Sequence, residues 1–143
     1  MSTAHAAALA NKTADGAAIV TAPGDWTAVH APASATQATA TKAAGTGTVR
    51  HVCTGIYAAF AQPTATPVAF TGNVVLRDGA TGAGTVIWQQ AIAVPATASE
   101  SRAIDISGLS IIGSAATAMT LEFTAAGGTA TFETITLTGH DIT

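Results

Sequence analysis

The sequence predicts an all-β fold, a single two-sheet β-sandwich of jelly-roll type with about eight strands. Short runs that contain Val or Ile alternate apolar residues with Thr at a period of two, as half-buried strands do. Turn signals rich in Gly and Pro recur at short, fairly even intervals, which is typical of sandwiches and barrels. Few segments between these turns are long enough for a helix. These three observations favour a sandwich over alternating strands and helices.

The composition favours a protein that lies against other protein. The chain has 143 residues, the usual size of one domain, and a net charge of −3. Charged residues make up 9% of it, whereas an average domain has about a quarter. The hydrophobic fraction of 48% includes many alanines, whose burial releases little free energy. We therefore expect a modest core and a surface with too few functional groups for most catalysis.

The charged residues and the single cysteine exclude several classes of partner. The basic residues stand singly and form no stripe that would neutralise phosphates. No run approaches the ~18 consecutive apolar residues of a membrane span. The first twelve residues lack the basic start and Leu-rich stretch of a secretion signal, and the lone Cys53 fits synthesis in a reducing cytoplasm. We expect neither nucleic acid nor a membrane as a partner. The five basic residues are Lys12, Lys42, Arg50, Arg77 and Arg102.

The first third of the chain is expected to form an extension of the sandwich. Residues 1–47 include a low-complexity stretch, 31–47, and the two short strand candidates Ile19–Val20 and Trp26–Val29. Few large apolar side chains anchor this part. We therefore divide the chain into an N-terminal arm or extension with short strands, 1–47, and a β-sandwich core, 48–143.

Two of the expected strand pairs lie in the middle of the chain. Residues 37–42 and 48–60 are expected to pair across 43–47. In the longer run, the alternation places Val52, Ile56 and Phe60 on one face and His51, Cys53 and Tyr57 on the other. Residues 73–78 and 85–92 are expected to form a hairpin whose glycine-rich loop, Gly79 to Gly84, is exposed and mobile.

The last third predicts one strand and a further hairpin. Residues 103–107 form a strand that continues beyond a bend at Gly108. Residues 117–126 and 129–138 are expected to pair across Gly127-Gly128. In the first strand of this hairpin, one face carries Met119, Leu121 and Phe123, and the other carries Thr120, Glu122 and Thr124. In the second strand, one face carries Ile135 and Leu137, and the other carries Thr134, Thr136 and Thr138. Such threonine rows are suited to flat contact with a neighbouring protein, because Thr hydroxyls pair with little loss of side-chain entropy.

Two residue pairs have side chains of the types that catalyse reactions or bind metals. His51 and Cys53 share a strand face, but no second cysteine or neighbouring histidine completes a metal site or an activated thiol. Glu122 and Glu133 are expected nearly opposite each other on adjacent strands, where a solvated face is the ordinary interpretation and a glycosidase-like pair the alternative. Trp26, Trp88 and Tyr57 are expected to anchor a core or an interface rather than a sugar. We expect no catalytic residues, no cofactor and no bound metal.

Three tracts resemble a known class of protein. They are VRHVCTGI at 49–56, LRDGATGAGTVIW at 76–88 and AMTLEF at 118–123. Their combination resembles the small virion proteins of tailed bacteriophages, in particular the cement or decoration proteins that clamp an icosahedral capsid. The resemblance implies a jelly-roll-like domain, self-association, binding across the outer seams of the major capsid protein, and no catalytic residues.

The expected function is therefore that of a non-enzymatic structural protein of the virion. It would sit on the capsid surface as a homodimer or homotrimer and bridge neighbouring capsomers. One alternative is a tail or head-fibre module that binds a host glycan or receptor through loops such as Gly79 to Gly84. Another is a glycan hydrolase that uses Glu122 and Glu133, which requires the two carboxylates in one cleft.

Overall fold

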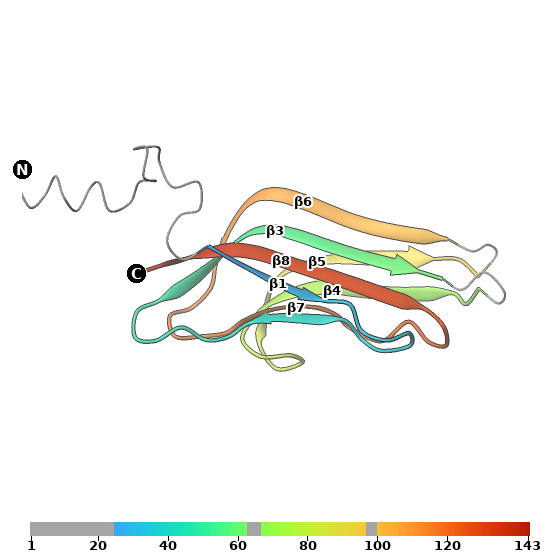
Figure 1. Cartoon of the computed structure of the whole chain (residues 1–143), viewed down its shortest axis with the longest axis horizontal. Coiled ribbons are helices and arrows are strands. Elements are labelled where there is room, and N and C mark those ends of the chain that lie inside the picture. The colour runs from blue at the N-terminus through green and yellow to red at the C-terminus, as the bar shows by residue number, and fades with distance from the viewer. Residues whose placement is uncertain (1–24, 63–66, 97–99) are drawn as a thin grey trace, which may run out of the picture.

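The computed structural model describes residues 25–62, 67–96 and 100–143, which form eight strands and no helix (Figure 1). The strands build two four-stranded antiparallel sheets, as the sequence predicts. Within the described ranges, no helix is long and apolar enough to cross a membrane. The strand candidate Ile19–Val20 lies outside the described residues.

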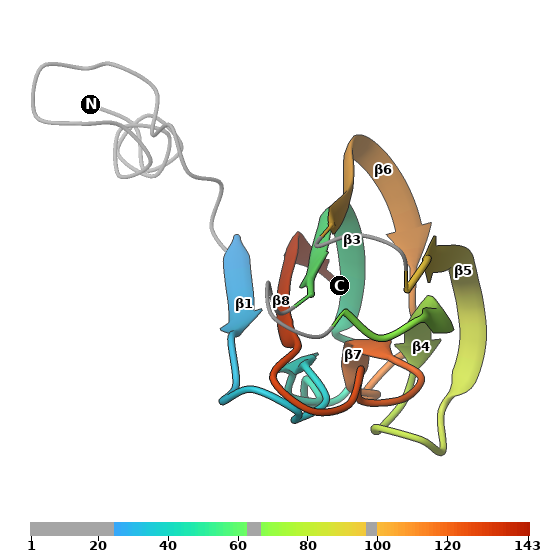
Figure 2. The ribbon, with the colours of Figure 1, turned by 90° about the vertical axis from the view of Figure 1, so that its right-hand side faces the viewer.

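The two sheets form the two layers of the sandwich. The first sheet has the order β1-β8-β3-β6 and the second the order β2-β7-β4-β5. In the view of Figure 2, β5 and β6 lie together on one side of the molecule and β1 lies on the opposite side. The strands are β1 (Trp26–His30), β2 (Thr39–Lys42), β3 (Arg50–Ala61), β4 (Phe70–Asp78), β5 (Thr85–Val94), β6 (Ser101–Ile112), β7 (Met119–Phe123) and β8 (Phe132–Ile142).

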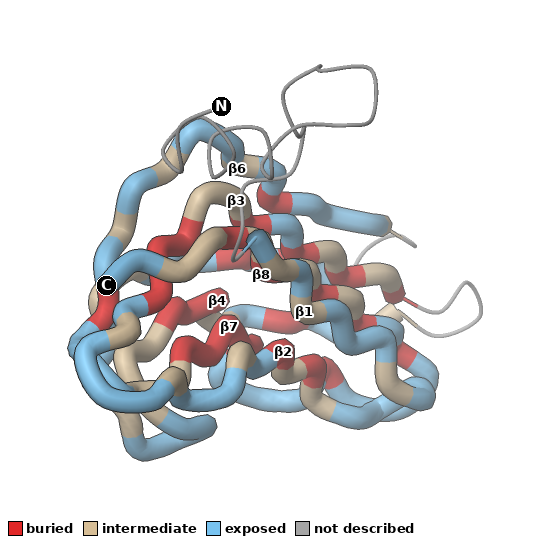
Figure 3. The backbone as a smooth tube through the Cα atoms, turned by 60° about the vertical axis from the view of Figure 1, so that its left-hand side comes forward, coloured by how far each residue is buried: buried red, intermediate tan, exposed pale blue. Residues whose placement is uncertain are grey.

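The core lies between the sheets and receives alternate side chains from each strand. Figure 3 shows buried positions alternating with more exposed ones along the strands of the first sheet. Phe60 of β3, Phe70 of β4 and Phe123 of β7 meet here, and the rings of Phe60 and Phe70 stack 4.4 Å apart. Burial of such large side chains is the main favourable contribution to folding in a chain whose other apolar residues are mostly small.

The segment 25–47 supplies the first two strands. β1 pairs with β8 and β2 pairs with β7, so each lies at an edge of one sheet. Ala38 and Ala40 are buried in the core. The short strands expected in this segment are thus present. The division into an arm, 1–47, and a core, 48–143, stays a prediction, because residues 1–24 lie outside the described part of the chain.

One of the three expected strand pairs is confirmed. β4 and β5 pair in antiparallel fashion across the loop 79–84. The strand expected at 103–107 is also present as part of β6, which continues past Gly108. Gly108 adopts a positive φ of 73°, a conformation that glycine adopts without steric cost. The expected bend therefore interrupts the register of β6 without ending the strand.

The expected hairpin between residues 117–126 and 129–138 is wrong. β7 pairs with β2 and β4, whereas β8 pairs with β1 and β3 in the other sheet. Residues 124–131 carry the chain from one sheet to the other. The alternation predicts which face of each strand is apolar but not which strand lies beside it. Two strands can bury their apolar faces as neighbours in one sheet or against each other from the two sheets of a sandwich.

The expected pairing of residues 37–42 with 48–60 is wrong for the same reason. β2 lies in the second sheet beside β7, and β3 lies in the first sheet between β8 and β6. A short connection favours a hairpin, but the apolar faces of β2 and β3 contribute to the core from opposite layers.

The expected faces of β3 are corrected by a β-bulge. The register with β6 and β8 shifts between Cys53 and Gly55, so the alternation restarts after Thr54. Cys53 and Ile56 consequently both belong to the core although they are three residues apart, and Tyr57 faces outward. Val52, expected beside Ile56, is buried outside this core cluster.

Candidate interaction face

The outer face of the first sheet carries rows of small polar side chains. Thr134, Thr136 and Thr138 alternate with buried residues of β8, as the sequence predicts for this threonine row. Thr136 and Thr138 each have directly paired residues on the neighbouring strands, so that each belongs to a row that crosses all four strands of the sheet. One row is Val29, Thr136, Tyr57 and Asp105, and the next is Thr27, Thr138, Gly55 and Ser107. We call these eight residues the outer rows.

The outer rows are almost without charge. Asp105 is their single ionisable acid, and Tyr57 and Val29, with 38% and 61% of their surface exposed, are their large side chains. Gly55 leaves room for the Thr138 hydroxyl, because a Cβ at Gly55 would lie 2.6 Å from the Thr138 Oγ1. That hydroxyl donates a hydrogen bond to the Gly55 carbonyl over 3.3 Å. The resulting surface is suited to a partner that offers backbone groups and small side chains.

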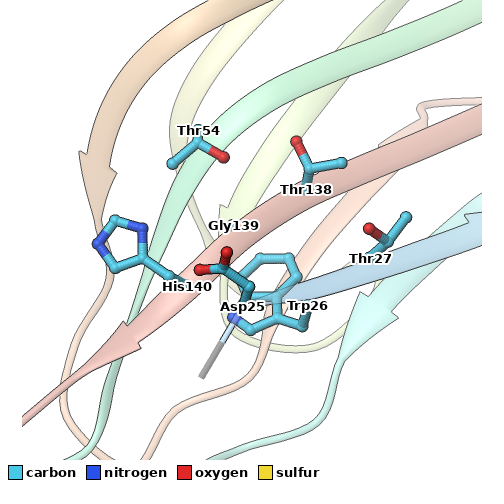
Figure 4. A pocket seen from close by; sticks show the side chains of 7 residues that line it. All are labelled: Asp25, Trp26, Thr27, Thr54, Thr138, Gly139 and His140. Atoms are coloured by element: carbon cyan, nitrogen blue, oxygen red, sulfur yellow. The ribbon is translucent and has the colours of Figure 1, made fainter. Parts of the chain in front are cut away.

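Two hollows adjoin each other on this face and share Thr138. The larger, of about 480 Å³, is lined by residues from β1, β3 and β8 and by Asp25 (Figure 4). Thr27, Thr54, Thr138 and His140 bring side chains to it from three strands. The smaller, of about 160 Å³, lies beside Tyr57 and Asp105. The face is therefore polar and shallowly indented.

A cluster of polar groups lies behind this face, at the end of the sandwich. The Trp26 indole donates a hydrogen bond to the Asp141 Oδ1 over 2.7 Å, and the His51 Nδ1 lies 2.7 Å from the same oxygen. The His51 Nε2 lies 2.8 Å from the Ala43 carbonyl oxygen. Each nitrogen of the His51 ring therefore faces an oxygen atom. The Lys42 Nζ lies 3.6 Å from the Asp141 Oδ2.

This cluster ties strands of both sheets together and explains the burial of His51. Its members come from β1, β2, β3 and β8, the strands that close one side of the sandwich. Gly139 makes the arrangement possible, because a Cβ there would lie 2.5 Å from the Trp26 Cζ2. Burial alone would raise the pKa of Asp141, but the hydrogen bonds from His51 and Trp26 and the charge of Lys42 lower it. Sequence reasoning missed this cluster, because Asp141 lies 90 residues from His51.

His51 and Cys53 do lie on the same side of β3, but they do not form a site together. The Cys53 Sγ lies 3.7 Å from the Gly55 carbonyl oxygen, and burial raises the pKa of the thiol to about 11. Such a thiol is protonated near neutral pH and is a poor nucleophile or ligand. No group of three or more His, Cys, Asp or Glu residues that could hold a metal ion occurs among the described residues.

Glu122 is buried beneath the loop 79–84, on the outer face of the second sheet. The Arg77 Nε donates to the Glu122 Oε1 over 2.5 Å, and the Gly82 backbone N–H donates to the same oxygen over 3.2 Å. The Arg77 Nη1 donates to the Gly84 carbonyl over 3.0 Å. The loop tip is exposed, as expected, but these contacts hold the loop against the sheet. The expectation that Glu122 is solvated is therefore wrong.

Glu133 is also buried, on the core-facing side of β8. Its Oε2 accepts a hydrogen bond from the Ala38 backbone N–H over 2.8 Å. Burial raises the pKa of Glu133, and the backbone N–H groups of Ala38 and Gly127 oppose this shift only in part. The expected opposition of Glu122 and Glu133 on adjacent strands is wrong, because β7 and β8 lie in different sheets.

The three amphipathic aromatic residues have different surroundings. Trp26 and Trp88 are half-buried and pack against the core. Tyr57 is exposed in the outer rows. The two tryptophans thus act as core anchors, in agreement with the expectation from sequence, and Tyr57 is available to a partner.

Comparisons with known proteins show no family for this chain. A scan against protein-family models and a search of curated proteins find no match. Among solved structures, the chain is similar to an arabinose-bound MgGH51 α-L-arabinofuranosidase, with 20% identity and a TM-score of 0.41. The likeness covers 76% of this chain but 18% of the arabinofuranosidase chain. A TM-score this low carries no argument about fold or activity.

Proposed function

We propose that this protein is a non-enzymatic structural protein of a bacteriophage virion, which binds the outer surface of the capsid and bridges neighbouring capsomers. The observation that carries this proposal is the nearly uncharged, threonine-rich outer face of the first sheet. Partners in this proposal are the major capsid protein and further copies of the chain, as a homodimer or homotrimer on the capsid surface.

The chemistry of the outer rows supports a broad, modest contact. Threonine hydroxyls donate and accept hydrogen bonds and lose little side-chain entropy when they are buried. Tyr57 offers a large amphipathic ring near the middle of the face, the residue type that often dominates interface energetics. Many copies on one shell multiply a modest contact through avidity. A capsid under internal pressure from DNA would be strengthened in this way.

We further propose that the sandwich is a jelly roll. The support is that the strand pairs are nested in the order of the chain. In the first sheet β1 neighbours β8 and β3 neighbours β6, and in the second sheet β2 neighbours β7 and β4 neighbours β5. Such nesting is what a long antiparallel hairpin gives when it is rolled into two sheets. The division of the chain into an arm or extension, 1–47, and a β-sandwich core, 48–143, belongs to the same proposal.

The test is to add the purified protein to capsids that lack it. We expect saturable, symmetric density in cryo-electron microscopy and a higher temperature of DNA release. Thr136→Arg, in the outer rows, should weaken binding at least tenfold, about 1.4 kcal/mol, because it places a long charged side chain in a flat contact. Thr71→Arg, at an exposed position of β4, is the matched control and should bind normally. Bare shells with unchanged DNA release would refute the proposal.

The larger hollow favours a second candidate, a tail or head-fibre module that binds a host glycan. Its volume of about 480 Å³ falls within the range of small-ligand sites, and its threonines and His140 can hydrogen-bond to sugar hydroxyls. This candidate predicts binding to a glycan array that Thr138→Arg abolishes, together with shells that stay bare. The two candidates therefore differ in both assays.

A further inference from the structure

The sandwich has four edge strands, and three of them carry features that discourage pairing with another chain. Proteins protect edges with short strands, charged side chains and irregular backbone. β1 and β2 have five and four residues, and β2 carries Lys42. β6 has twelve residues but contains Arg102, Asp105 and the irregular position Gly108.

β5 is the exception. Its ten residues, Thr85–Val94, include no charged residue, no proline and no glycine. A register shift against β4 leaves Ile87 as a bulge, and the seven residues from Trp88 to Val94 then continue in regular register. Among the described residues, no strand pairs with the other side of β5. Its free backbone groups therefore form a regular, uncharged edge.

Side chains along this edge are incompletely covered. Val86 has 41% of its surface exposed, and Ile87 and Trp88 are half-buried. Gln90 is exposed although it pairs with Val74, whose side chain is wholly buried in the core. The core-facing side of β5 is thus open to water at Gln90, and β5 lies on the same side of the sandwich as the other long edge strand, β6 (Figure 2).

We propose that β5 is a self-association edge, on which β5 of a second copy pairs in antiparallel fashion from Trp88 to Val94. The contact would be centred on Ala91 and would join two second sheets into one continuous sheet. This inference rests on the self-association in the proposed function and names the surface responsible for it.

A second copy is the favoured occupant because of charge and symmetry. Pairing β5 with itself places no charged side chain in the contact, whereas pairing it with β6 would bring the charged Arg102 and Asp105 into it. Antiparallel pairing of two identical strands also generates a twofold axis, so the contact closes at two copies. Main-chain hydrogen bonds would supply the attraction, and removal of Trp88 from water would add to it.

The first test measures the mass of the full-length protein in solution over a range of concentrations, by sedimentation or light scattering. We expect a dimer for the wild type. Ala91→Lys should weaken the dimer at least tenfold, because it places two ammonium groups opposite each other at the centre of the contact. Ala103→Lys, at an exposed position of the edge strand β6, is the matched control and should leave the dimer intact. A wild type that is monomeric throughout, or a dimer that Ala91→Lys leaves unchanged, would overturn the inference.

A second test does not depend on destabilising the dimer. Directly opposed residues in antiparallel strands have Cα atoms about 4.5–5.5 Å apart, within the range of a disulfide. Ala91→Cys should therefore form a covalent dimer under mild oxidation, whereas Ala103→Cys should not. No cross-link at Ala91 would overturn the proposed register and with it the inference.

These tests are independent of capsid binding. A monomeric protein that still decorates shells would refute the edge contact and leave the proposed function standing. A dimer linked through β5 that leaves the shells bare would refute the proposed function and leave the edge contact standing.

Discussion

Asp141 holds together the cluster that joins β1, β2, β3 and β8. Its carboxylate accepts hydrogen bonds from Trp26 and His51 and lies near Lys42. Because these contacts lower its pKa despite burial, its contribution to stability is present above its ordinary value of 3.8 and is lost as the pH falls through the lower, folded-state value.

Asp141→Asn should therefore destabilise the protein by about 1–3 kcal/mol at pH 7 and by less at pH 3, which lies below the ordinary pKa of 3.8. Urea unfolding at both pH values measures this. Asp105→Asn, at an exposed position of the outer rows, is the control and should change stability by less than about 0.5 kcal/mol. An equal effect of Asp141→Asn at both pH values would contradict the assignment.

Glu133 should make stability depend on pH in the opposite direction. Burial raises its pKa above 4.5 in the folded state, so the folded state retains a proton that the unfolded state has released. Stability should then fall as the pH rises from 4.5 toward the folded-state pKa. Glu133→Gln removes the ionisation and should flatten this part of the profile. Urea unfolding between pH 4 and 7 provides the comparison, and parallel profiles for the two proteins would show that Glu133 is not responsible.

Cys53 should be unreactive in the folded protein. Its pKa of about 11, against an ordinary 9.0, lowers the thiolate fraction near pH 8, and only the thiolate reacts. Labelling by an aromatic disulfide should be at least about 100-fold slower than for a cysteine placed at the exposed Ser110. Denaturant should abolish the difference. Equal rates in the folded protein would mean that the site opens readily.

Among the elements, the loop between β4 and β5 depends on one buried ion pair. Arg77 and the Gly82 N–H both donate to Glu122, whose side chain is 2% exposed. Glu122→Ala would leave Arg77 without its partner beside the sheet and should destabilise the protein by about 3 kcal/mol or more.

The same substitution should free the loop. Limited proteolysis between Ala80 and Ala83 should become faster in Glu122→Ala, while Thr81→Ala at the exposed loop tip should leave both stability and cleavage unchanged. Cleavage of Glu122→Ala at the wild-type rate would mean that the loop is held by other contacts.

The sequence predicts the faces of strands better than their partners. The period of two correctly placed the threonine row of β8 outward and Leu121 inward. It paired β4 with β5 correctly, because a glycine-rich loop joins strands of one sheet there. It paired β7 with β8 wrongly, since an apolar face is buried equally well against a neighbour or across the core.

Buried polar residues were the least predictable part of the site. Glu122 occupies an outward position of β7, and only the return of the loop 79–84 over the sheet buries it. The sequence correctly places His51 on the same strand face as Cys53, but the partner of His51, Asp141, comes from a strand 90 residues away. Such contacts depend on sheet order, which alternation alone does not determine.

At the scale of the whole molecule, the two proposed contacts occupy separate surfaces. The outer rows lie on the first sheet, and the free edge of β5 belongs to the second. Pairing through β5 would therefore leave the outer rows of both copies available to a shell. A dimer of this kind would present two faces, and two weak contacts on one particle bind far more tightly than either alone.

The low charge of the molecule leads to a last prediction, that capsid binding tolerates salt. The outer rows carry one charged side chain, Asp105, and the whole chain has a net charge of −3. Raising the ionic strength from 0.1 M to 1 M shortens the screening length from about 10 Å to about 3 Å. A contact built from hydroxyls, backbone groups and Tyr57 depends little on such screening, and the apolar part is strengthened by many salts. Titration of labelled protein onto undecorated shells should therefore give affinities that differ by less than about tenfold over this range.

The variant Asp105→Asn, which removes the one charged side chain of the outer rows, should show almost the same dependence of affinity on salt as the wild type. Loss of binding at 1 M salt would mean that charged groups outside the outer rows make the contact, and the interaction face would have to be sought elsewhere on the sandwich.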